Sequence, residues 1–278
     1  MKVVFCLDDK PQYLMLLKGA VRSLRRVHGP DVPCLCVYGG KDERIAEAVQ
    51  EENIPFAWRK TPLLNYESMP QRTHRVMGAF LKLELSLVPE LAAEDYVLYC
   101  DTDVYFHRPI TELLEMKPAY MAMAKEETAP FHHEHEELTY TYKDHEYTVP
   151  LPFPIWTYNS GVVLFNLDRL RRHDYIHNFL TFCRQTADKI GNFDQSMLNY
   201  FFGKRIERFD QVYNCPPYMF RSKEEGCIVH FHGPKPWDTQ RKMWQDLRIN
   251  HYWYFRDLWF ALMNDAEKEE IQAWDVVA

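Results

Sequence analysis

The chain has 278 residues, a formal net charge of −7 and 46% hydrophobic residues. This composition excludes a disordered or fibrous protein, and the length is sufficient to bury a large core in one α/β domain or in two small ones. The acidic net charge argues against nucleic acid as a partner, because nucleic-acid binding needs basic surface that neutralises phosphates.

The cysteines and the apolar segments favour a cytoplasmic protein. The seven cysteines form neither a disulfide pattern nor a zinc pattern, which indicates a reducing compartment. The apolar start of the chain is too short for a signal peptide before Asp8 and Asp9 intervene. No segment reaches the roughly twenty apolar residues of a membrane span.

Strands and helices alternate in the first third of the chain. Apolar, β-prone runs predict strands at residues 2–7, 33–38 and 54–58, and helical spacing predicts helices after Pro11 and at residues 41–52. This alternation predicts a parallel sheet that is wrapped by helices.

A predicted loop at residues 60–72 and a predicted helix at residues 75–87 lead into a strand that carries two carboxylates. Residues 96–106 are apolar and β-prone except around Asp101 and Asp103, which is typical of a buried strand. Open α/β sheets bind ligands beyond the carboxyl ends of such strands, and the i, i+2 spacing aims both carboxylates to one side. Because two close carboxylates repel each other, a divalent cation between them is one interpretation. A strand-to-turn boundary is the other.

The second half of the chain contains one unusual segment. A short helix after Arg108 and a strand at residues 119–124 precede residues 131–154, which are rich in His and Glu and contain three prolines near their end. We expect this segment to form a solvated loop that covers a substrate pocket, with a second metal site as the alternative.

The remaining predicted elements are strands at residues 159–166, 204–209 and 227–231, a helix at residues 167–190 with a basic solvated face, and a helix that starts near Asp194. An Asp at such a helix start also suits an N-cap. From residue 238 onward the chain reads as aromatic-rich helix. We therefore expect one domain over residues 1–237 and a helical C-terminal appendage over residues 238–278 that packs on it.

Five segments occur in an order that matches a known family. They are FCLDD, LYCDTDV, NSGVVLFNLDRLRRHD, FDQSMLNYF and HFHGPKPW. This ordered set resembles glycosyltransferase family 8, the retaining nucleotide-sugar transferases that include glycogenin and bacterial lipopolysaccharide galactosyl- and glucosyltransferases. The resemblance implies the GT-A fold, a three-layer α/β/α sandwich with a mixed, mainly parallel sheet. It also implies a UDP-sugar donor and Mn²⁺ or Mg²⁺.

The resemblance assigns the metal to Asp101, Asp103 and His230. Without it, His230 reads as an ordinary histidine at a strand end. Mixed oxygen and imidazole ligands suit Mn²⁺ better than Mg²⁺.

The other implied site residues hold the donor or face the transferred sugar. Donor binding is expected of Asp8, Asp9, Lys82, Thr102, Gly233 and Lys235, and the sugar side of Asn159, Asp194 and Gln195. Arg75 is an alternative to Lys82. Two positions depart from the family pattern: Lys10 replaces a polar amide, and one residue instead of two separates Gly233 from Lys235.

The implied activity is retaining, metal-dependent transfer of a hexose, galactose or glucose, from a UDP-sugar to a glycan or glycolipid acceptor. Retention can proceed through a covalent intermediate or by same-face attack. Acidic residues between Asp265 and Glu270 repel anionic lipid, so we expect the C-terminal aromatic residues to pack on the domain, with at most weak peripheral membrane contact. A nucleotide-sugar hydrolase and a non-catalytic nucleotide-sugar-binding protein are the alternatives.

Overall fold

A seven-stranded sheet forms the centre of the protein in a computed structural model, which describes residues 1–61, 63, 77–126, 137–150, 157–190, 193–238 and 251–275. Its strands are β1 (Lys2–Leu7), β2 (Cys34–Tyr38), β3 (Phe56–Trp58), β4 (Tyr96–Cys100), β6 (Met121–Lys125), β9 (Tyr158–Asn166) and β10 (Ile206–Arg208). They are ordered β10-β6-β9-β4-β1-β2-β3. Strand β9 is antiparallel to both of its neighbours, β4 and β6, and the other pairs are parallel.

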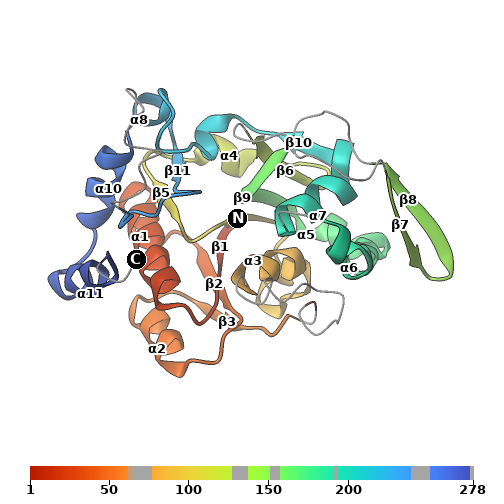
Figure 1. Ribbon diagram of the computed structural model, residues 1–278, viewed down its shortest axis with the longest axis horizontal. Helices are drawn as coiled ribbons and strands as arrows, with labels where there is room; N and C mark the ends of the chain where they lie inside the picture. The colour runs from red at the N-terminus through yellow and green to blue at the C-terminus, as the bar shows by residue number, and fades with distance from the viewer. Residues whose placement is uncertain are drawn as a thin grey trace.

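Helices cover both faces of this sheet (Figure 1). Helices α1 (Pro11–His28) and α2 (Glu43–Glu51) lie on one face, and α3 (Met77–Leu81), α5 (Leu167–Arg171), α6 (Tyr175–Thr186) and α7 (Phe193–Phe202) lie on the other. Alternate residues of a strand point to opposite faces, so Phe5 joins the core beneath α1 while Val4 joins the core beneath α3. The predicted three-layer α/β/α sandwich with a mixed, mainly parallel sheet is therefore confirmed.

The predicted strand at residues 96–106 is divided between two sheets. Strand β4 ends at Cys100, and after Asp101-Thr102-Asp103 the chain continues as β5 (Val104–Phe106) outside the main sheet. Strand β5 pairs in antiparallel fashion with β11 (Ile228–His230), with Val104 opposite His230. The two aspartates thus lie in the link between the sheets.

The loop predicted at residues 131–154 was wrong in part. Within the predicted loop at 131–154, residues 137–150 form a hairpin of β7 (Glu137–Tyr142) and β8 (His145–Pro150), which projects beside α6 in Figure 1. Lys143 (φ 48°) and Asp144 (φ 61°) form the positive-φ turn that suits a two-residue hairpin. The rest of that segment, residues 131–136 and 151–154, lies outside the described residues.

The second correction concerns the helix predicted at residues 167–190. It is broken between α5 and α6, where Asp174 adopts φ 60°. A non-glycine residue in this region of backbone space interrupts helical hydrogen bonding, and its short side chain tolerates the conformation.

The shorter elements complete the described chain. They are α4 (Thr111–Glu115), α8 (Ser222–Glu225) and the 3₁₀-helices Lys82–Leu87, Pro89–Leu91, Arg172–Asp174, Ala187–Lys189, Gly203–Arg205 and Gln211–Tyr213. The helix predicted at residues 75–87 is thus α3 followed by a 3₁₀ segment, and most of the loop predicted at residues 60–72 lies outside the described residues.

Helices α10 (Tyr252–Phe260) and α11 (Asp265–Asp275) pack beside α1, at the left of Figure 1. The indole of Trp259 lies directly over Gly19, where an added Cβ would be 2.0 Å from Trp259 Nε1. Only glycine therefore allows α10 to approach α1 this closely. Packing of these aromatic residues is observed, whereas a domain boundary at residue 237 stays a prediction.

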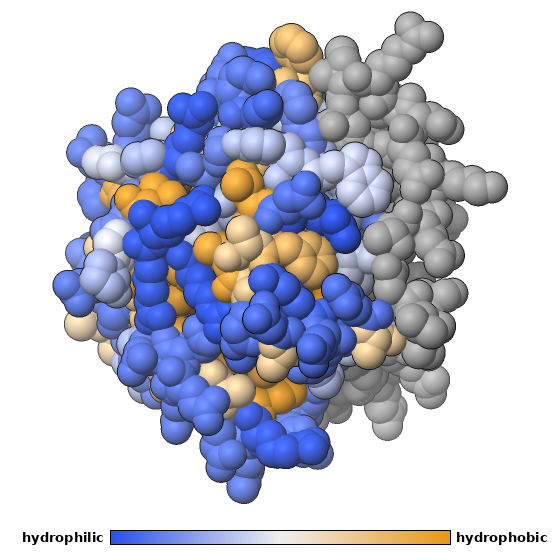
Figure 2. Space-filling model, turned by 90° about the vertical axis from the view of Figure 1, so that its left-hand side faces the viewer, coloured by the Kyte–Doolittle hydropathy of each residue, from blue (hydrophilic) through white to orange (hydrophobic). Residues whose placement is uncertain are grey.

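The face formed by these helices is mainly hydrophilic, with apolar side chains in separate groups (Figure 2). Tyr252 and Trp259 are buried, while Trp253 and Tyr254 are partly exposed. Among the residues that the structure describes, no helix has both the length and the apolar character needed to cross a bilayer.

A charged cluster fastens α11 to α1. Glu267 accepts hydrogen bonds from Arg22 (2.6 Å) and Lys18 (2.9 Å). Its carboxylate also accepts from the Asn264 N–H, and its own N–H donates to Asn264 Oδ1, which forms a capping box. Burial alone would raise the pKa of Glu267, but the bonds from Arg22, Asn264 and Lys18 lower it to about 2.

This cluster predicts a pH-dependent stability. Because the pKa of Glu267 is lower in the folded chain than the ordinary value of 4.5, its contribution is present above about pH 4.5 and is lost as the pH falls toward 2. We expect Glu267→Gln to be less stable than the parent protein by on the order of 2 kcal/mol at pH 7. Urea unfolding at pH 7 and pH 3 should show the difference shrinking in acid. Glu269→Gln, at an exposed position of the same helix, is the control, and equal stability of all three proteins at pH 7 would contradict the assignment.

Candidate active site

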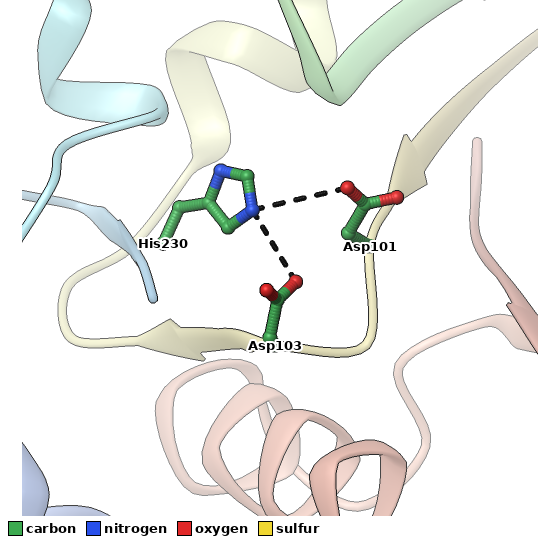
Figure 3. Close-up of side chains that lie close together, drawn as sticks. All are labelled: Asp101, Asp103 and His230. Atoms are coloured by element: carbon green, nitrogen blue, oxygen red, sulfur yellow. Dashed lines mark ion pairs between the residues drawn. The ribbon is translucent and has the colours of Figure 1, made fainter. Parts of the chain in front are cut away.

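Two backbone contacts place the acidic link between the sheets. The Asp101 N–H donates to the Gly161 carbonyl oxygen (2.7 Å), which fixes the end of β4 against β9, and the Phe231 N–H donates to the Asp103 carbonyl oxygen (2.8 Å). The second bond extends the pairing of β5 with β11. As a result, His230 faces the two carboxylates from the opposite strand (Figure 3).

The ligand atoms of Asp101, Asp103 and His230 all lie within 4.8 Å of one another. His230 Nε2 is 3.3 Å from Asp103 Oδ1 and 3.8 Å from Asp101 Oδ2. His230 and Asp103 are buried, and Asp101 is partly exposed. Two carboxylate oxygens and one imidazole nitrogen that converge at this spacing fit a divalent cation with room for further ligands. The structure therefore brings together the three residues that the sequence predicts as metal ligands.

Lys235 occupies the other side of Asp103. Its Nζ lies 2.5 Å from Asp103 Oδ2 and 2.9 Å from the Phe231 carbonyl oxygen. Burial would raise the pKa of Asp103, but Lys235 and His230 hold it well below its usual range. Gly233 has φ 121°, a conformation that favours glycine, in the turn that returns Lys235 toward the site. The shortened loop between Gly233 and Lys235 thus still brings the lysine to the acidic pair.

Lys82 connects the acidic pair to α7. Its ammonium lies 2.9 Å from Asp101 Oδ1, 2.9 Å from Asp194 Oδ2 and 3.0 Å from the Ser160 carbonyl oxygen, and it also stacks on the Tyr99 ring. The side chain is almost fully buried. Burial disfavours the charged form, but Asp101 and Asp194 raise the pKa of Lys82 above its ordinary value. Lys82 is therefore a charged bridge with all its donors used, and its competitor Arg75 lies outside the described residues.

Asp194 and Gln195 lie in the first turn of α7, so Asp194 is inside the helix. Ser160 binds both: its hydroxyl donates to Asp194 Oδ2 (2.7 Å), and its N–H donates to Gln195 Oε1 (3.0 Å). These bonds join the start of β9 to the start of α7. The two side chains predicted for the sugar side are thus held in fixed orientations.

Asp8 and Asp9 follow β1, and Thr102 is a buried residue between Asp101 and Asp103. Asp8 is buried at the end of β1, where burial raises its pKa, and it accepts a bond from the Lys10 N–H (3.2 Å). Asp9 accepts bonds from the Tyr38 hydroxyl and from the backbone before α2, so it ties β1 to that turn. Their assignment to the nucleotide stays a prediction.

A cavity of 490 Å³ collects most of the remaining site residues. Of those predicted, it is lined by Lys82, Asp101, Asp103, Asn159, Asp194, Gln195, His230, Gly233 and Lys235. The wall formed by described residues does not include Asp8, Asp9 or Thr102.

The cavity also exposes residues that sequence reasoning did not assign. They are Ala79, Glu126, Ser160, Gly161 and His232. Ser160, Gly161 and His232 stand inside the motifs NSG and HFHG, so closer reading of those motifs would have found them. Glu126 follows β6 without any local signal. The pKa of His232 is lowered to about 4 by burial and by the neighbouring His230.

A mixed sheet with helices on both faces and an acidic pair beyond a central strand fits the GT-A fold. The family model described as "Glycosyl transferase family 8" matches residues 40–241. The chain belongs to this family, as its ordered motifs predict.

Solved structures agree in fold. The crystal structure of the galactosyltransferase LgtC in complex with donor and acceptor sugar analogs is 23% identical, with a TM-score of 0.71 over 97% of this chain and 99% of that one. GlyE of Streptococcus pneumoniae is 18% identical, with a TM-score of 0.60 over 98% of this chain and 62% of that one. Mouse xyloside xylosyltransferase 1 is 15% identical, with a TM-score of 0.53 over 83% and 96%. A search of curated proteins gave no match.

The buried bridge generates a stability prediction. Lys82→Met removes the cation between Asp101 and Asp194 and leaves two carboxylates without their shared partner. We expect a loss of about 3–5 kcal/mol in the free energy of unfolding, measured with urea. Lys204→Met, which replaces an exposed lysine of the 3₁₀-helix Gly203–Arg205, is the control and should unfold like the parent protein. A stable Lys82→Met variant would show that the bridge does not hold the site together.

Proposed function

We propose that the protein is a retaining, divalent-metal-dependent glycosyltransferase that moves a hexose, galactose or glucose, from a UDP-sugar to a hydroxyl of a glycan or glycolipid. Its membership of glycosyltransferase family 8 supports the reaction class. The observation that carries the finer proposal is the convergence of Asp101, Asp103 and His230 on one wall of the cavity, with Lys235 beside them.

Asp101, Asp103 and His230 would hold the metal, with Mn²⁺ preferred over Mg²⁺ because one ligand is an imidazole. When bound, the ion supplies Lewis-acid stabilisation of the charge on the leaving diphosphate, worth several kcal/mol. The donor set fits such an ion, since two carboxylates in a partly buried place need a compensating charge.

The two lysines have different roles in this proposal. Lys235 is partly exposed beside Asp103, and it would add positive charge at the diphosphate in a partly dry site. Lys82 is buried, and its ammonium group already binds Asp101, Asp194 and the Ser160 carbonyl oxygen. It would therefore orient the two carboxylates without contacting the donor. Gly233 keeps the backbone beside Lys235 close to the same group.

Asp194, Gln195 and Asn159 would face the transferred sugar. Breaking the bond between C1 and the diphosphate leaves positive charge on the ring, which the Asp194 carboxylate or the Gln195 amide oxygen stabilises from below. Both routes to retention, a covalent intermediate and same-face attack within an ion pair, need a fixed group at that place. Ser160 supplies the fixation by binding both side chains.

The nucleotide and acceptor ends complete the proposal. Asp8, Asp9 and Thr102 would contact the uridine side of the donor. The acceptor is a glycan or glycolipid, the reaction is cytoplasmic, and peripheral membrane contact is at most weak, because Tyr252 and Trp259 are used in packing. Nucleic acid is not a partner.

A donor screen tests the function. Purified protein is incubated with UDP-galactose, UDP-glucose and other UDP-sugars, with and without Mn²⁺ and with candidate glycan acceptors, and UDP release is followed. We expect Mn²⁺-dependent release with a UDP-hexose that increases when an acceptor is supplied. Free sugar that is undiminished by any acceptor would identify a hydrolase. Heat of donor binding without turnover would identify a non-catalytic binding protein.

The metal assignment has its own test. We expect Asp101→Ala to lower kcat/KM by at least about 100-fold, because it removes one ligand and one partner of Lys82. Asp31→Ala, at an exposed turn before β2, is the matched control and should retain parental activity. Undiminished and metal-independent turnover by Asp101→Ala would refute the assignment.

A further inference from the structure

We propose that Asn214 is a positioning residue that fixes His230 in the tautomer with hydrogen on Nδ1, so that Nε2 presents a lone pair toward Asp101 and Asp103. The inference rests on the proposed metal-dependent function. The observations behind it are hydrogen bonds and a close contact within this chain.

Two partners set the orientation of the Asn159 side-chain amide. The Gly161 N–H, which can only donate, lies 2.9 Å from Asn159 Oδ1. On the other side, the Asn159 Nδ2 group donates to the Glu126 carboxylate, which accepts at Oε2 (2.7 Å). Exchanging the oxygen and nitrogen of Asn159 would break both bonds. The oxygen of Asn159 is therefore assigned by its partners.

Asn214 takes its orientation from this oxygen. Its Nδ2 donates to Asn159 Oδ1 over 2.9 Å, and the opposite orientation would place two amide oxygens against each other at that distance. Asn214 Oδ1 consequently faces His230 Nδ1, also at 2.9 Å. An amide oxygen can only accept, so the hydrogen lies on Nδ1. Asn214 and His230 are buried, so water does not compete for these bonds.

Gly161 restrains the same imidazole near Cε1. A Cβ at this position would lie 2.0 Å from His230 Cε1, so the ring packs directly on the glycine backbone. Asn214 binds the ring at Nδ1, and Gly161 packs against Cε1. Together they restrict the rotation that would carry Nε2 away from the acidic pair.

The amides of Asn159 and Asn214 act against an interaction between Asp103 and His230 that favours the other tautomer. Asp103 Oδ1 lies 3.3 Å from His230 Nε2 and by itself favours a hydrogen on that nitrogen. A hydrogen there blocks the lone pair that a metal ion needs. Residues that fix the tautomer of a histidine ligand typically contribute 10-fold to 100-fold in metal affinity. Asn214 thus acts on the metal through His230 without contacting it.

Nuclear magnetic resonance of metal-free protein with ¹⁵N-labelled histidine tests the tautomer directly. Long-range ¹H–¹⁵N correlations at about pH 8, above the ordinary histidine pKa of about 6.5, distinguish which ring nitrogen carries the hydrogen. The His230 signals are assigned by their loss in His230→Gln. In the parent protein we expect hydrogen on Nδ1, and in Asn214→Ala we expect a mixture or hydrogen on Nε2.

Binding of Mn²⁺ alone, followed by the loss of its free electron paramagnetic resonance signal, gives a second readout. We expect Asn214→Ala to weaken binding by about 10-fold or more. The matched control is Asn166→Ala, which removes a buried asparagine at the opposite end of β9 and should leave the tautomer and Mn²⁺ affinity unchanged. Hydrogen on Nε2 in the parent protein would overturn the proposal, even if Asn214→Ala failed to fold. So would parental Mn²⁺ affinity in Asn214→Ala. The tautomer is read without donor or turnover, so a failed donor screen would leave it standing and would count only against the proposed function.

Discussion

The short antiparallel pairing of β5 with β11 is the contact on which the site depends. It brings His230 to the link between β4 and β5, although the two strands are distant in the sequence. The pair is held between two cores. Phe106 and Ile228 join the core beneath α1, while Tyr105 and Val229 join the cluster formed with α10 and α11. The C-terminal helices therefore support the strand pair that forms the candidate metal site.

Charge compensation divides the site into a fixed part and an adjustable part. Lys82 is almost fully buried and bonded to Asp101, Asp194 and the Ser160 carbonyl, so moving it would leave buried charges without partners. Lys235 is partly exposed and holds one carboxylate, Asp103. In the proposed reaction, the donor diphosphate would therefore exchange partners with Lys235 at lower cost than with Lys82. The negative charge that remains on Asp101 and Asp103 is what makes a divalent cation a suitable neighbour.

The parts of the structure that local sequence determines were the ones that could be predicted. The apolar run before Asp101 showed a buried strand that ends in a carboxylate pair, but its local pattern did not show that the chain then leaves the main sheet. His230 became a candidate ligand only through the family resemblance, since a lone histidine at a strand end carries no such signal. Asn214 lies two residues before a pair of prolines in an irregular segment, and its contacts to Asn159 and His230 come from tertiary structure.

The predictions for residues 131–154 and 167–190 were wrong in part because local sequence did not contain the information needed. Residues 137–150 are polar and aromatic, and the prolines around them favoured a loop, yet alternate side chains such as Leu138 and Tyr140 find an apolar surface on α6. The break at Asp174 depends on a left-handed residue that is not glycine, which propensity alone does not reveal. Packing on α6 decided the outcome for the hairpin, and at Asp174 the side chain accepts bonds from Tyr142 and Lys143 of that hairpin.

The reversed direction of β9 explains how one short segment reaches every part of the site. Because β9 is antiparallel to β4 and β6, its beginning lies where those strands end. The register of β9 with β6 shifts at this beginning of the strand. The N–H groups of Ser160 and Gly161 therefore bind side chains and do not take part in the hydrogen bonds between the strands. Ser160 uses its group to hold Gln195, and Gly161 uses its group to orient Asn159, while the Gly161 carbonyl holds Asp101. An all-parallel sheet would place the start of this strand at the opposite edge. The mixed sheet is therefore the feature that joins the candidate metal ligands to Asp194 and Gln195.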